Sequence, residues 1–497
     1  MLSALFILQL PSFYYKILRF LPSFYYKFVE TLPSFYYICR VKSLKDKNME
    51  SFNRKALEWL RNWKVSNSRK PLILRGARQV GKTTLVTEFA KEYDTFLHLN
   101  LEKEEDRLLF EKYNDVNKLL QAIFILKGKL YTDKNVLLFI DEIQNSQKAV
   151  SILRYFYEEA NHIHVITAGS LLETLMDVRK ISFPVGRVQY FALRPCTFSE
   201  FIGALGNTFD LQYLENCEVP EVIHPRLMEQ FREYILCGGM PAAIVQYAET
   251  KDILSVKDTY ESLLLSYKDD VEKYTSNPAM VKIIRSILTN GWRSAAETIS
   301  FEGFGGTAYR SREMGEAFQI INKAMLLELV YPSSDVQCPI MPNMRKRPKL
   351  MWLDTGLVNY ASGIQHDVFF ASEINDIWRG RVTEHIVGQE LLAISNDVSA
   401  QRHYWRRDKA GSDAEVDFVY IYKGLVIPIE VKSGINSKLK SLHQFMDIAP
   451  HDIAIRVWSN PYSEDKVMTS NGKTFRLINL PFYYVGQLEK ILGKILV

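Results

Sequence analysis

The stretch Arg75-Gly76-Ala77-Arg78-Gln79-Val80-Gly81-Lys82-Thr83-Thr84 decides the fold, because it has the spacing G-x-x-x-x-G-K-[ST] at every fixed position. Gly76 and Gly81 allow the backbone to turn so that successive N–H groups point at phosphate oxygens. Lys82 can place its charge between the β- and γ-phosphates of a nucleotide, and the Thr83 hydroxyl can bind Mg²⁺. The residues expected to hold the phosphates are Gly76, Ala77, Arg78, Gln79, Val80, Gly81, Lys82, Thr83 and Thr84.

The flanking sequence supports a phosphate loop over a plain glycine turn. A short apolar run at 71–74 predicts a buried strand before the loop, and Leu85 and Phe89, four residues apart, predict a helix over 83–91 after it. The helix dipole would favour an anion at this point. Further apolar runs alternate with helical stretches such as 150–159, which predicts an α/β fold with a parallel sheet covered on both faces. These runs are 96–101, 136–140, 163–167 and 188–193.

Two adjacent carboxylates, Asp141 and Glu142, follow the apolar run 136–140. A strand that delivers carboxylates at its carboxyl end is the expected Mg²⁺ half of a phosphate-loop site, with Asp141 holding the metal. Glu142 could orient or deprotonate the attacking water. The alternative is a surface Asp-Glu pair.

Two further groups are candidates for the catalytic set. Ser170 follows the run 163–167 and could sense the γ-phosphate, in preference to Thr167. Arg187 could act as an arginine finger, or it could simply be a solvated or ion-paired arginine. The predicted catalytic residues are therefore Glu142, Lys82, Ser170 and Arg187, and the predicted metal ligands are Thr83 and Asp141.

The length of 497 residues predicts several domains, and a net charge of +5 neither requires nor excludes nucleic acid. Five scattered cysteines without zinc-ligand spacing are typical of a reducing cytoplasm. Leu-Pro-Ser-Phe-Tyr-Tyr occurs at Leu10, Leu21 and Leu32, and basic residues interrupt the apolar runs too early for a membrane span. We expect residues 1–48 to be translated repeat DNA before a natural start at Met49; an aromatic membrane-surface anchor is the alternative.

The middle of the chain gives weaker signals. Residues 206–226 are expected to be an irregular connector, and 311–327 an amphipathic helix with Arg310 and Arg312 near its start. Such a helix could enter a DNA groove or could only hold domains together. The basic run 345–349 could attract phosphate backbones, or it could be a solvated loop.

A hairpin is predicted near the C-terminus, with strands at 414–420 and 425–432. Glu430 and Lys432 share a face because they are two residues apart. Asp417 and Glu430 could bind Mg²⁺ beside a phosphodiester, Lys432 could stabilise the attacking hydroxide, and Glu384 could complete the metal shell. Glu415 competes with Asp417 for this role. The alternative is an edge hairpin with surface ion pairs.

The motifs at 76–84, 139–144, 168–170, 185–188 and 193–201 resemble those of prokaryotic AAA-type ATPases, in particular ATP-binding proteins with a C-terminal domain of unknown function. The resemblance implies a winged-helix module and a half similar to the PD-(D/E)xK nuclease superfamily, whose motif order Glu384, Asp417, Glu430 and Lys432 matches. The expected domains are a repeat segment at 1–48, the ATPase at 49–205, a helical connector at 206–275, the winged helix at 276–354 and the nuclease-like domain at 355–497.

Together these features predict a cytoplasmic ATPase with ATP and Mg²⁺ as cofactors, which couples hydrolysis to a DNA-associated C-terminal half. The alternative is a non-enzymatic switch that binds ATP and recruits a protein partner through a degenerate nuclease fold. Membrane association is not expected, and the oligomeric state does not follow from the sequence.

Overall fold

The computed structural model describes residues 54–132, 134–169, 184–363, 380–408, 414–432 and 439–496. The expectations for residues 1–48 and for Ser170 lie outside these ranges. None of the helices described here is both long and apolar enough to cross a bilayer.

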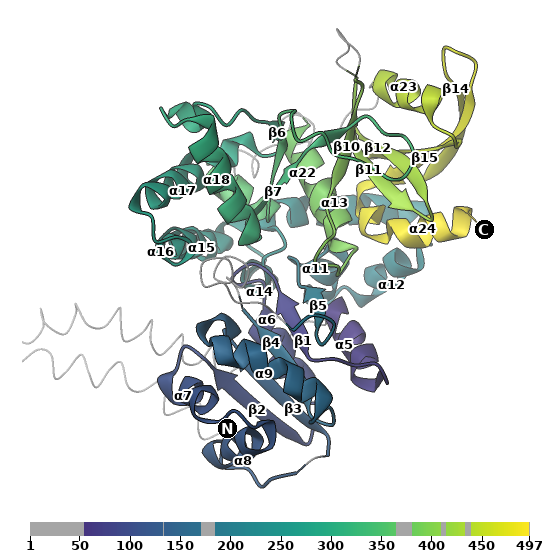
Figure 1. Ribbon diagram of the computed structural model, residues 1–497. Coiled ribbons are helices and arrows are strands. Elements are labelled where there is room, and N and C mark those ends of the chain that lie inside the picture. Colours follow the sequence, from purple (N-terminus) through teal and green to yellow (C-terminus); the bar gives the residue numbers. More distant parts are fainter. Residues whose placement is uncertain are drawn as a thin grey trace, which may run out of the picture. The chain divides into compact units, whose positions relative to one another are not determined.

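The first sheet consists of five parallel strands in the order β2-β3-β4-β1-β5 (Figure 1). The order places β4 between the strand that precedes the phosphate loop and the strand that ends at Asp141. All five strands overlap predicted runs, so the predicted parallel α/β sheet is confirmed. The strands are β1 (Leu72–Arg75), β2 (Thr95–Asn100), β3 (Val136–Asp141), β4 (His164–Ala168) and β5 (Gln189–Ala192).

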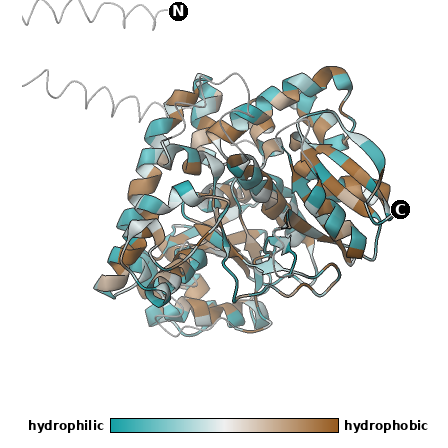
Figure 2. Ribbon diagram, turned by 90° about the horizontal axis from the view of Figure 1, so that it is seen from above, coloured by the Kyte–Doolittle hydropathy of each residue, from teal (hydrophilic) through white to brown (hydrophobic). Residues whose placement is uncertain are grey.

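Helices cover both faces of this sheet. Successive side chains of β1 point to opposite faces, so apolar residues in this strand contribute to a core on each side. Leu72 and Leu74 lie in one apolar core with side chains of the first two helices, whereas Ile73 lies in a second core with the other three. Figure 2 shows the corresponding alternation of hydrophobic and hydrophilic residues along many of the helices. The five helices are α5 (Lys55–Val65), α6 (Lys82–Ala90), α7 (Glu104–Lys112), α8 (Val116–Leu126) and α9 (Gln147–Glu158).

A helical region follows the first sheet. The prediction of an irregular connector over 206–226 is wrong, since α12 (Thr208–Asn216) lies within it. Leu214 of this helix is fully buried, and the carboxylate of Asp210 is paired with Arg226. The other helices of the region are α11 (Phe198–Ala204), α13 (His224–Cys237), α14 (Pro241–Thr250), α15 (Lys257–Asp269), α16 (Val271–Tyr274), α17 (Pro278–Asn290) and α19 (Thr355–Ala361).

A small antiparallel sheet has the order β6-β9-β7 and packs with α17 and α18 (Ser311–Lys323). The predicted helix over 311–327 ends earlier than expected, because Met325 has φ 59° and Leu327 begins a strand. Trp292 stacks on Trp352 of this sheet with ring centroids 3.8 Å apart. The strands are β6 (Glu297–Thr298), β7 (Leu327–Val330) and β9 (Lys349–Trp352).

The third sheet has seven strands in the order β14-β15-β13-β12-β11-β10-β8. The predicted hairpin is confirmed: β11 (Glu415–Tyr422) pairs antiparallel with β12 (Leu425–Val431) through a turn at Lys423 and Gly424, both with positive φ. Helices α22 (Arg381–Ala393) and α23 (Lys440–Ile448) pack against the sheet in separate cores, and α24 (Leu488–Ile495) closes the chain. The remaining strands are β8 (Pro332–Ser333), β10 (His403–Arg406), β13 (Ile453–Trp458), β14 (Ser463–Met468) and β15 (Thr474–Pro481).

Candidate functional site

The phosphate loop joins β1 to the start of α6. At two of its positions, Gly76 and Gly81, the backbone requires a glycine. A Cβ added to Gly76 would lie 2.5 Å from the carbonyl oxygen of Leu193, and Gly81 has φ 93°. Gln79 also adopts a left-handed conformation, with φ 65°. Alternating backbone conformations of this kind turn N–H groups toward one point and make a concave anion site. The first amides of α6 add to it, because the residue at the N-cap of that helix, Gly81, has no side chain to cap them.

Lys82 lies within this loop and is buried. Its Nζ donates hydrogen bonds to the carbonyl oxygens of Gly76 at 2.8 Å and Ala77 at 2.9 Å. Burial lowers the pKa of Lys82 to about 8, although the nearby carboxylates of Glu142 and Asp141 act in the opposite direction. A bound polyphosphate would offset the cost of this buried charge, so the loop fits a nucleotide.

Thr83 and Asp141, the two predicted metal ligands, are adjacent in the structure. Thr83 Oγ1 donates a hydrogen bond of 2.9 Å to Asp141 Oδ2, although the residues come from the start of α6 and the end of β3. A hydroxyl and a carboxylate are oxygen donors of the type that Mg²⁺ prefers, so the pair fits this ion beside a nucleotide. His98 of the neighbouring strand β2 lies 3.9 Å from Asp141 Oδ2.

Glu142 occupies a strained position directly after β3. Its φ of 52° is left-handed, which is uncommon for a residue with a side chain. The side-chain amide of Gln144 donates a hydrogen bond to the Glu142 carboxylate. Burial raises the pKa of Glu142, while this hydrogen bond opposes the shift. A carboxylate with a raised pKa beside the metal position can accept a proton from water.

The other predicted catalytic groups lie elsewhere. Arg187 precedes β5, at the end of the sheet opposite the phosphate loop, and its Nε donates to Glu158 at 2.8 Å. Thr167 is fully buried and donates to the carbonyl oxygen of Leu72 at 3.4 Å. Arg78 of the loop is paired with Asp270, which lies between α15 and α16. The structure therefore brings together Lys82, Thr83, Asp141 and Glu142 but not Arg187.

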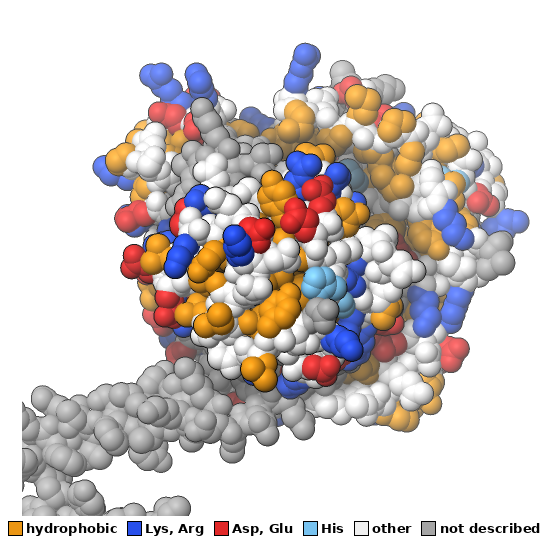
Figure 3. Space-filling view, turned by 60° about the horizontal axis from the view of Figure 1, so that its bottom comes forward, with side chains coloured by type: hydrophobic (Ala, Val, Ile, Leu, Met, Phe, Trp, Pro, Cys, Tyr) orange, Lys and Arg blue, Asp and Glu red, His pale blue; other side chains and the backbone are white. Residues whose placement is uncertain are grey.

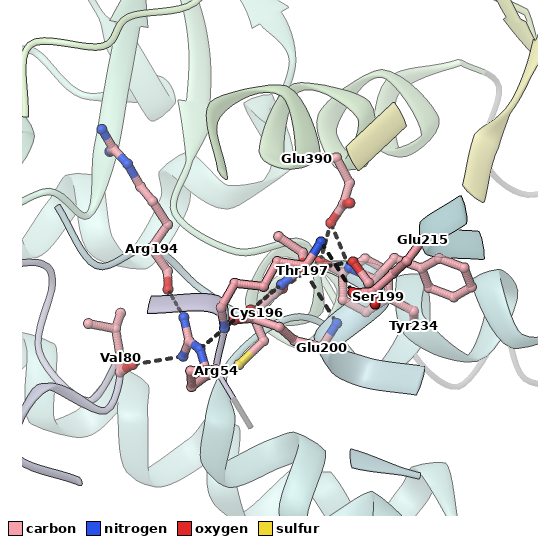
Figure 4. Close-up of polar contacts among 12 residues, drawn as sticks. Arg54, Val80, Arg194, Cys196, Thr197, Ser199, Glu200, Glu215, Tyr234 and Glu390 are labelled. Carbon is pink, nitrogen blue, oxygen red and sulfur yellow. Dashed lines mark hydrogen bonds and ion pairs between the residues drawn. The ribbon is translucent and has the colours of Figure 1, made fainter. Parts of the chain in front are cut away.

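A partly buried arginine connects the phosphate loop to the segment after β5 (Figure 4). Arg54 donates hydrogen bonds to the carbonyl oxygen of Val80 at 3.3 Å and to that of Arg194 at 2.7 Å. It also donates to Glu200 at 3.0 Å. Glu200 completes the capping box of α11 with Thr197, so the helix start is tied to the same arginine.

The contacts continue into the C-terminal half through Glu390 of α22. Glu390 Oε1 accepts a hydrogen bond from the backbone N–H of Phe198 at 3.0 Å and lies 2.8 Å from the Tyr234 hydroxyl. Burial raises the pKa of Glu390 to about 7. Pro241 of α14 lies near Gly81 of the phosphate loop, since a Cβ added to Gly81 would lie 3.5 Å from its ring.

The predicted C-terminal residues also come together, around a lysine that the sequence did not single out for this role. Lys349 Nζ lies 2.5 Å from Glu384 Oε1 and 2.9 Å from Glu415 Oε1. The prediction that the basic run 345–349 is a solvated or phosphate-attracting surface is therefore wrong for Lys349, whose side chain is 3% exposed. The reason is that Lys349 begins β9, where two carboxylates face it.

The remaining members of this cluster have partners of their own. Asp417 Oδ2 accepts a hydrogen bond of 2.7 Å from the backbone N–H of Val431, and Lys432 Nζ lies 2.7 Å from Glu430 Oε1. Burial raises the pKa of Glu430 to about 7 and that of Glu384 to about 8. Burial alone would lower the pKa of Lys349, but its carboxylate neighbours raise it.

The carboxylates of this arrangement are paired with lysines. Within the described ranges, no group of three or more carboxylate, imidazole or thiol side chains could hold a metal ion. Four carboxylates instead face two ammonium groups, and burial raises the pKa of Asp417 as it does that of Glu384 and Glu430. We call Lys349, Glu384, Glu415, Asp417, Glu430 and Lys432 the lysine–carboxylate cluster.

Comparison with known proteins agrees with the first sheet and the phosphate loop. Residues 68–202 match the family model of an AAA domain. Residues 228–368 match a domain of unknown function (DUF8612), and residues 379–483 match a second one (DUF4143). The AAA match, the phosphate loop and the parallel sheet support an AAA-type ATP-binding protein. No curated protein matches this chain.

Several solved structures are similar to the chain at low identity. The Walker-type ATPase PABY2304 of Pyrococcus abyssi is 16% identical, with 63% of this chain and 97% of that chain covered and a TM-score of 0.39. The ORC2 protein of Aeropyrum pernix is 13% identical, with 65% and 99% covered and a TM-score of 0.29. The RuvB Holliday junction branch migration motor of Thermotoga maritima is 15% identical, with 59% and 93% covered and a TM-score of 0.26.

Proposed function

We propose that this chain is a Mg²⁺-dependent ATPase. The observation that carries the proposal is that the buried Lys82 and the Thr83–Asp141 pair lie together at the carboxyl ends of the parallel strands β1 and β3. The loop amides and Lys82 would bind the β- and γ-phosphates, and Thr83 and Asp141 would hold Mg²⁺. The ion would neutralise charge on the phosphates, and Glu142 would orient and deprotonate water.

We further infer that the nucleotide state acts on the C-terminal half. The phosphate loop contacts that half directly through the ion pair of Arg78 with Asp270. The hydroxyl of Tyr267 also donates to the carbonyl oxygen of Arg78 at 3.2 Å. A movement of the loop on binding ATP would have to be accommodated by α14–α16, which gives the predicted coupling a physical route.

For the C-terminal half, the lysine–carboxylate cluster favours the alternative of a degenerate nuclease fold over an active nuclease. Lys349 pairs with Glu384 and Glu415, and Lys432 pairs with Glu430, so three of the four carboxylates already have a cationic partner. Figure 3 shows the end of the molecule that carries the first sheet, where basic and acidic side chains are interspersed. The winged-helix module, DNA and a protein partner stay predictions, because the families that match this half have no assigned function.

Two assays test these proposals. ATP hydrolysis with Mg²⁺ should be abolished in Lys82→Ala and unchanged in Arg154→Gln, whose side chain is exposed and paired with Glu158. Full turnover in Lys82→Ala would overturn the ATPase. Mg²⁺-dependent cleavage of DNA is not expected from the parent protein. Cleavage that is lost in both Asp417→Ala and Lys432→Ala would show that the cluster is an active nuclease site after all.

A further inference from the structure

A histidine beside the proposed magnesium position has a ring nitrogen without a hydrogen bond. His98 lies on β2 opposite Phe139 of the neighbouring strand β3, which ends at Asp141 (Figure 1). Its side chain is 37% exposed, but its Nε2 is buried and has no hydrogen-bond partner among the residues that the structure describes. A buried polar atom in that state costs free energy, so the position favours a group that can form a hydrogen bond with it.

The orientation of the imidazole ring is fixed by aromatic neighbours. The ring stacks on Phe139 with ring centroids 5.0 Å apart, and on Phe96 with ring centroids 5.9 Å apart. Phe96 precedes His98 by two residues on β2, so both side chains lie on the same face of the sheet. These contacts restrict rotation of the ring and keep Nε2 near the carboxylate of Asp141.

The carboxylate of Asp141 does not itself satisfy this nitrogen. Nε2 lies 3.9 Å from Asp141 Oδ2, which is too far for a hydrogen bond. The same oxygen already accepts a hydrogen bond of 2.9 Å from the Thr83 hydroxyl. The unpartnered nitrogen therefore lies beside the two oxygen donors that fit Mg²⁺.

Other charged side chains near His98 do not supply the hydrogen bond either. Asp106 and Lys127 are paired with each other at 2.7 Å, and Asp106 also accepts a hydrogen bond from the backbone N–H of Asn100. Lys103, the third of these groups, is exposed. The buried nitrogen is thus available to a group that arrives with the nucleotide.

A hydrated magnesium ion has the chemistry that this nitrogen requires. Mg²⁺ gives up its water reluctantly and keeps several water molecules at nucleotide sites. A water on a cation directs its hydrogens outward, so its neighbours must accept hydrogen bonds, and a neutral imidazole has one accepting nitrogen. Since Mg²⁺ prefers oxygen ligands to imidazole, a contact through water is favoured over direct ligation.

We propose that His98 is a positioning residue of the nucleotide site, with Nε2 accepting a hydrogen bond from a water on the Mg²⁺ that Thr83 and Asp141 would hold. The inference rests on the proposed ATPase function. It adds a contact from β2, which lies outside the phosphate loop and outside the carboxylates after β3. Contacts of this kind orient the ligands of a metal, and their loss weakens metal binding.

The test measures the contribution of the ion to nucleotide binding, without hydrolysis. The non-hydrolysable imido analogue of ATP is titrated into the full-length protein with Mg²⁺ and again with EDTA, at a pH of about 8, where imidazole is neutral. The ratio of the two dissociation constants gives the coupling between ion and nucleotide. In His98→Phe, which keeps the ring stacking but has no acceptor, this ratio should fall about fivefold, while binding in EDTA stays unchanged.

Three further variants separate the acceptor from the packing of the ring. His98→Gln can place its carbonyl oxygen near the position of Nε2 and should keep the ratio of the parent. His98→Asn is too short to reach that position and should behave as His98→Phe does, so it replaces that variant if the phenylalanine does not fold. His162→Phe, at an exposed histidine of the same domain, should leave both constants unchanged.

The outcomes distinguish this inference from the proposed function. Binding that depends on Mg²⁺ in the parent, with the same ratio in His98→Phe and His98→Asn, would overturn the role of His98 alone. An equal fall in His98→Gln would also overturn it, because an acceptor at that position would then make no difference. Absence of nucleotide binding by the folded parent would overturn the proposed function, and this inference with it.

Discussion

The two neighbouring carboxylates of the nucleotide site differ in environment, and this difference assigns their roles. Asp141 accepts hydrogen bonds from the Thr83 hydroxyl and from the backbone N–H of Glu142, which hold its carboxylate in place for the proposed role of Mg²⁺ ligand. Glu142 has a left-handed backbone, and burial raises its pKa. Strained residues are retained where the surrounding structure holds them in place, which is frequent at sites of reaction.

Glu142→Gln should therefore retain ATP binding and lose at least about 100-fold in turnover, because the amide cannot accept a proton from water. Binding is measured by titration with ATP and Mg²⁺, and turnover by phosphate release. Glu159→Gln, at an exposed position on the same domain, is the matched control. Unchanged turnover in Glu142→Gln would remove this residue from the mechanism.

The lysine–carboxylate cluster predicts a dependence of stability on pH. Burial raises the pKa of Glu384 to about 8 and that of Glu430 to about 7, from a value of 4.5 in the unfolded chain. Between the unfolded pKa of 4.5 and the folded values of about 7 and about 8, these two carboxyl groups bind more protons in the folded protein than in the unfolded chain. The free energy of unfolding therefore falls as pH rises through this range. A fall on the order of 2 kcal/mol is expected between pH 5 and 8.

Urea unfolding at several pH values measures this effect. The double variant Glu384→Gln/Glu430→Gln should show a shallower fall than the parent, whereas Glu159→Gln should follow the parent. The difference between the two curves isolates the cluster from other groups, such as Glu390, whose pKa burial also raises. A parent protein that became more stable from pH 5 to 8 would contradict the assigned protonation.

At the scale of elements, close contact between α19 and α13 depends on a glycine. A Cβ added to Gly356 would lie 2.5 Å from the carbonyl oxygen of Cys237 and 2.3 Å from the Tyr260 hydroxyl. Because backbone atoms cannot move as easily as side chains, Gly356→Ala should destabilise the fold by about 1–3 kcal/mol. Denaturant unfolding measures this value.

Gly203→Ala is the control for this substitution. Its Cβ would have one neighbour, Leu211 Cδ2, at 3.5 Å, so stability should be unchanged or slightly higher. Equal stability of Gly356→Ala and the parent would mean that the two helices are less closely packed than described.

Elements that depend on local patterns could be predicted from the sequence. The strands of the first sheet are short apolar runs bounded by polar residues. The hairpin at 415–431 has two strand patterns joined by a Lys-Gly pair, which is typical of a tight turn. Helix α12 could not be predicted from its sequence pattern, because few of its side chains, such as Leu214, are apolar and buried. The buried Asp210 depends on an ion pair with Arg226, which lies outside the helix. The end of α18 depends on the turn at Met325, which has no proline or glycine to mark it.

For the whole molecule, the difference between local patterns and distant contacts also applies to the site residues. Residues in local motifs could be predicted from the sequence, whereas residues whose roles depend on distant contacts could not. Lys82 and Thr83 belong to one contiguous motif, and Asp141 ends a recognisable strand, so their positions followed from local order. Arg54, Lys349 and His98 acquire their roles from contacts with distant segments, such as Lys349 with Glu384. Pairings of this kind leave no periodic signal in a single sequence.

The contact between Arg78 and Asp270 predicts how the halves communicate. Hydrogen exchange of residues 257–274 should slow when ATP and Mg²⁺ bind to the parent protein, because the phosphate loop is then fixed against them. In Asp270→Asn this slowing should be reduced, since the ion pair with Arg78 is lost. Asp258→Asn, an exposed change on α15, should behave as the parent does. An identical response in Asp270→Asn would exclude this contact as the route.

The proposed function depends on the binding of a nucleotide with Mg²⁺ by the loop at 76–84. Isothermal titration of ATP with Mg²⁺ into the folded full-length protein tests it most directly. We expect saturable binding at one phosphate-loop site, weakened at least about tenfold by Lys82→Ala and unchanged by Arg154→Gln. Absence of ATP uptake by a well-folded protein in the presence of Mg²⁺ would contradict it.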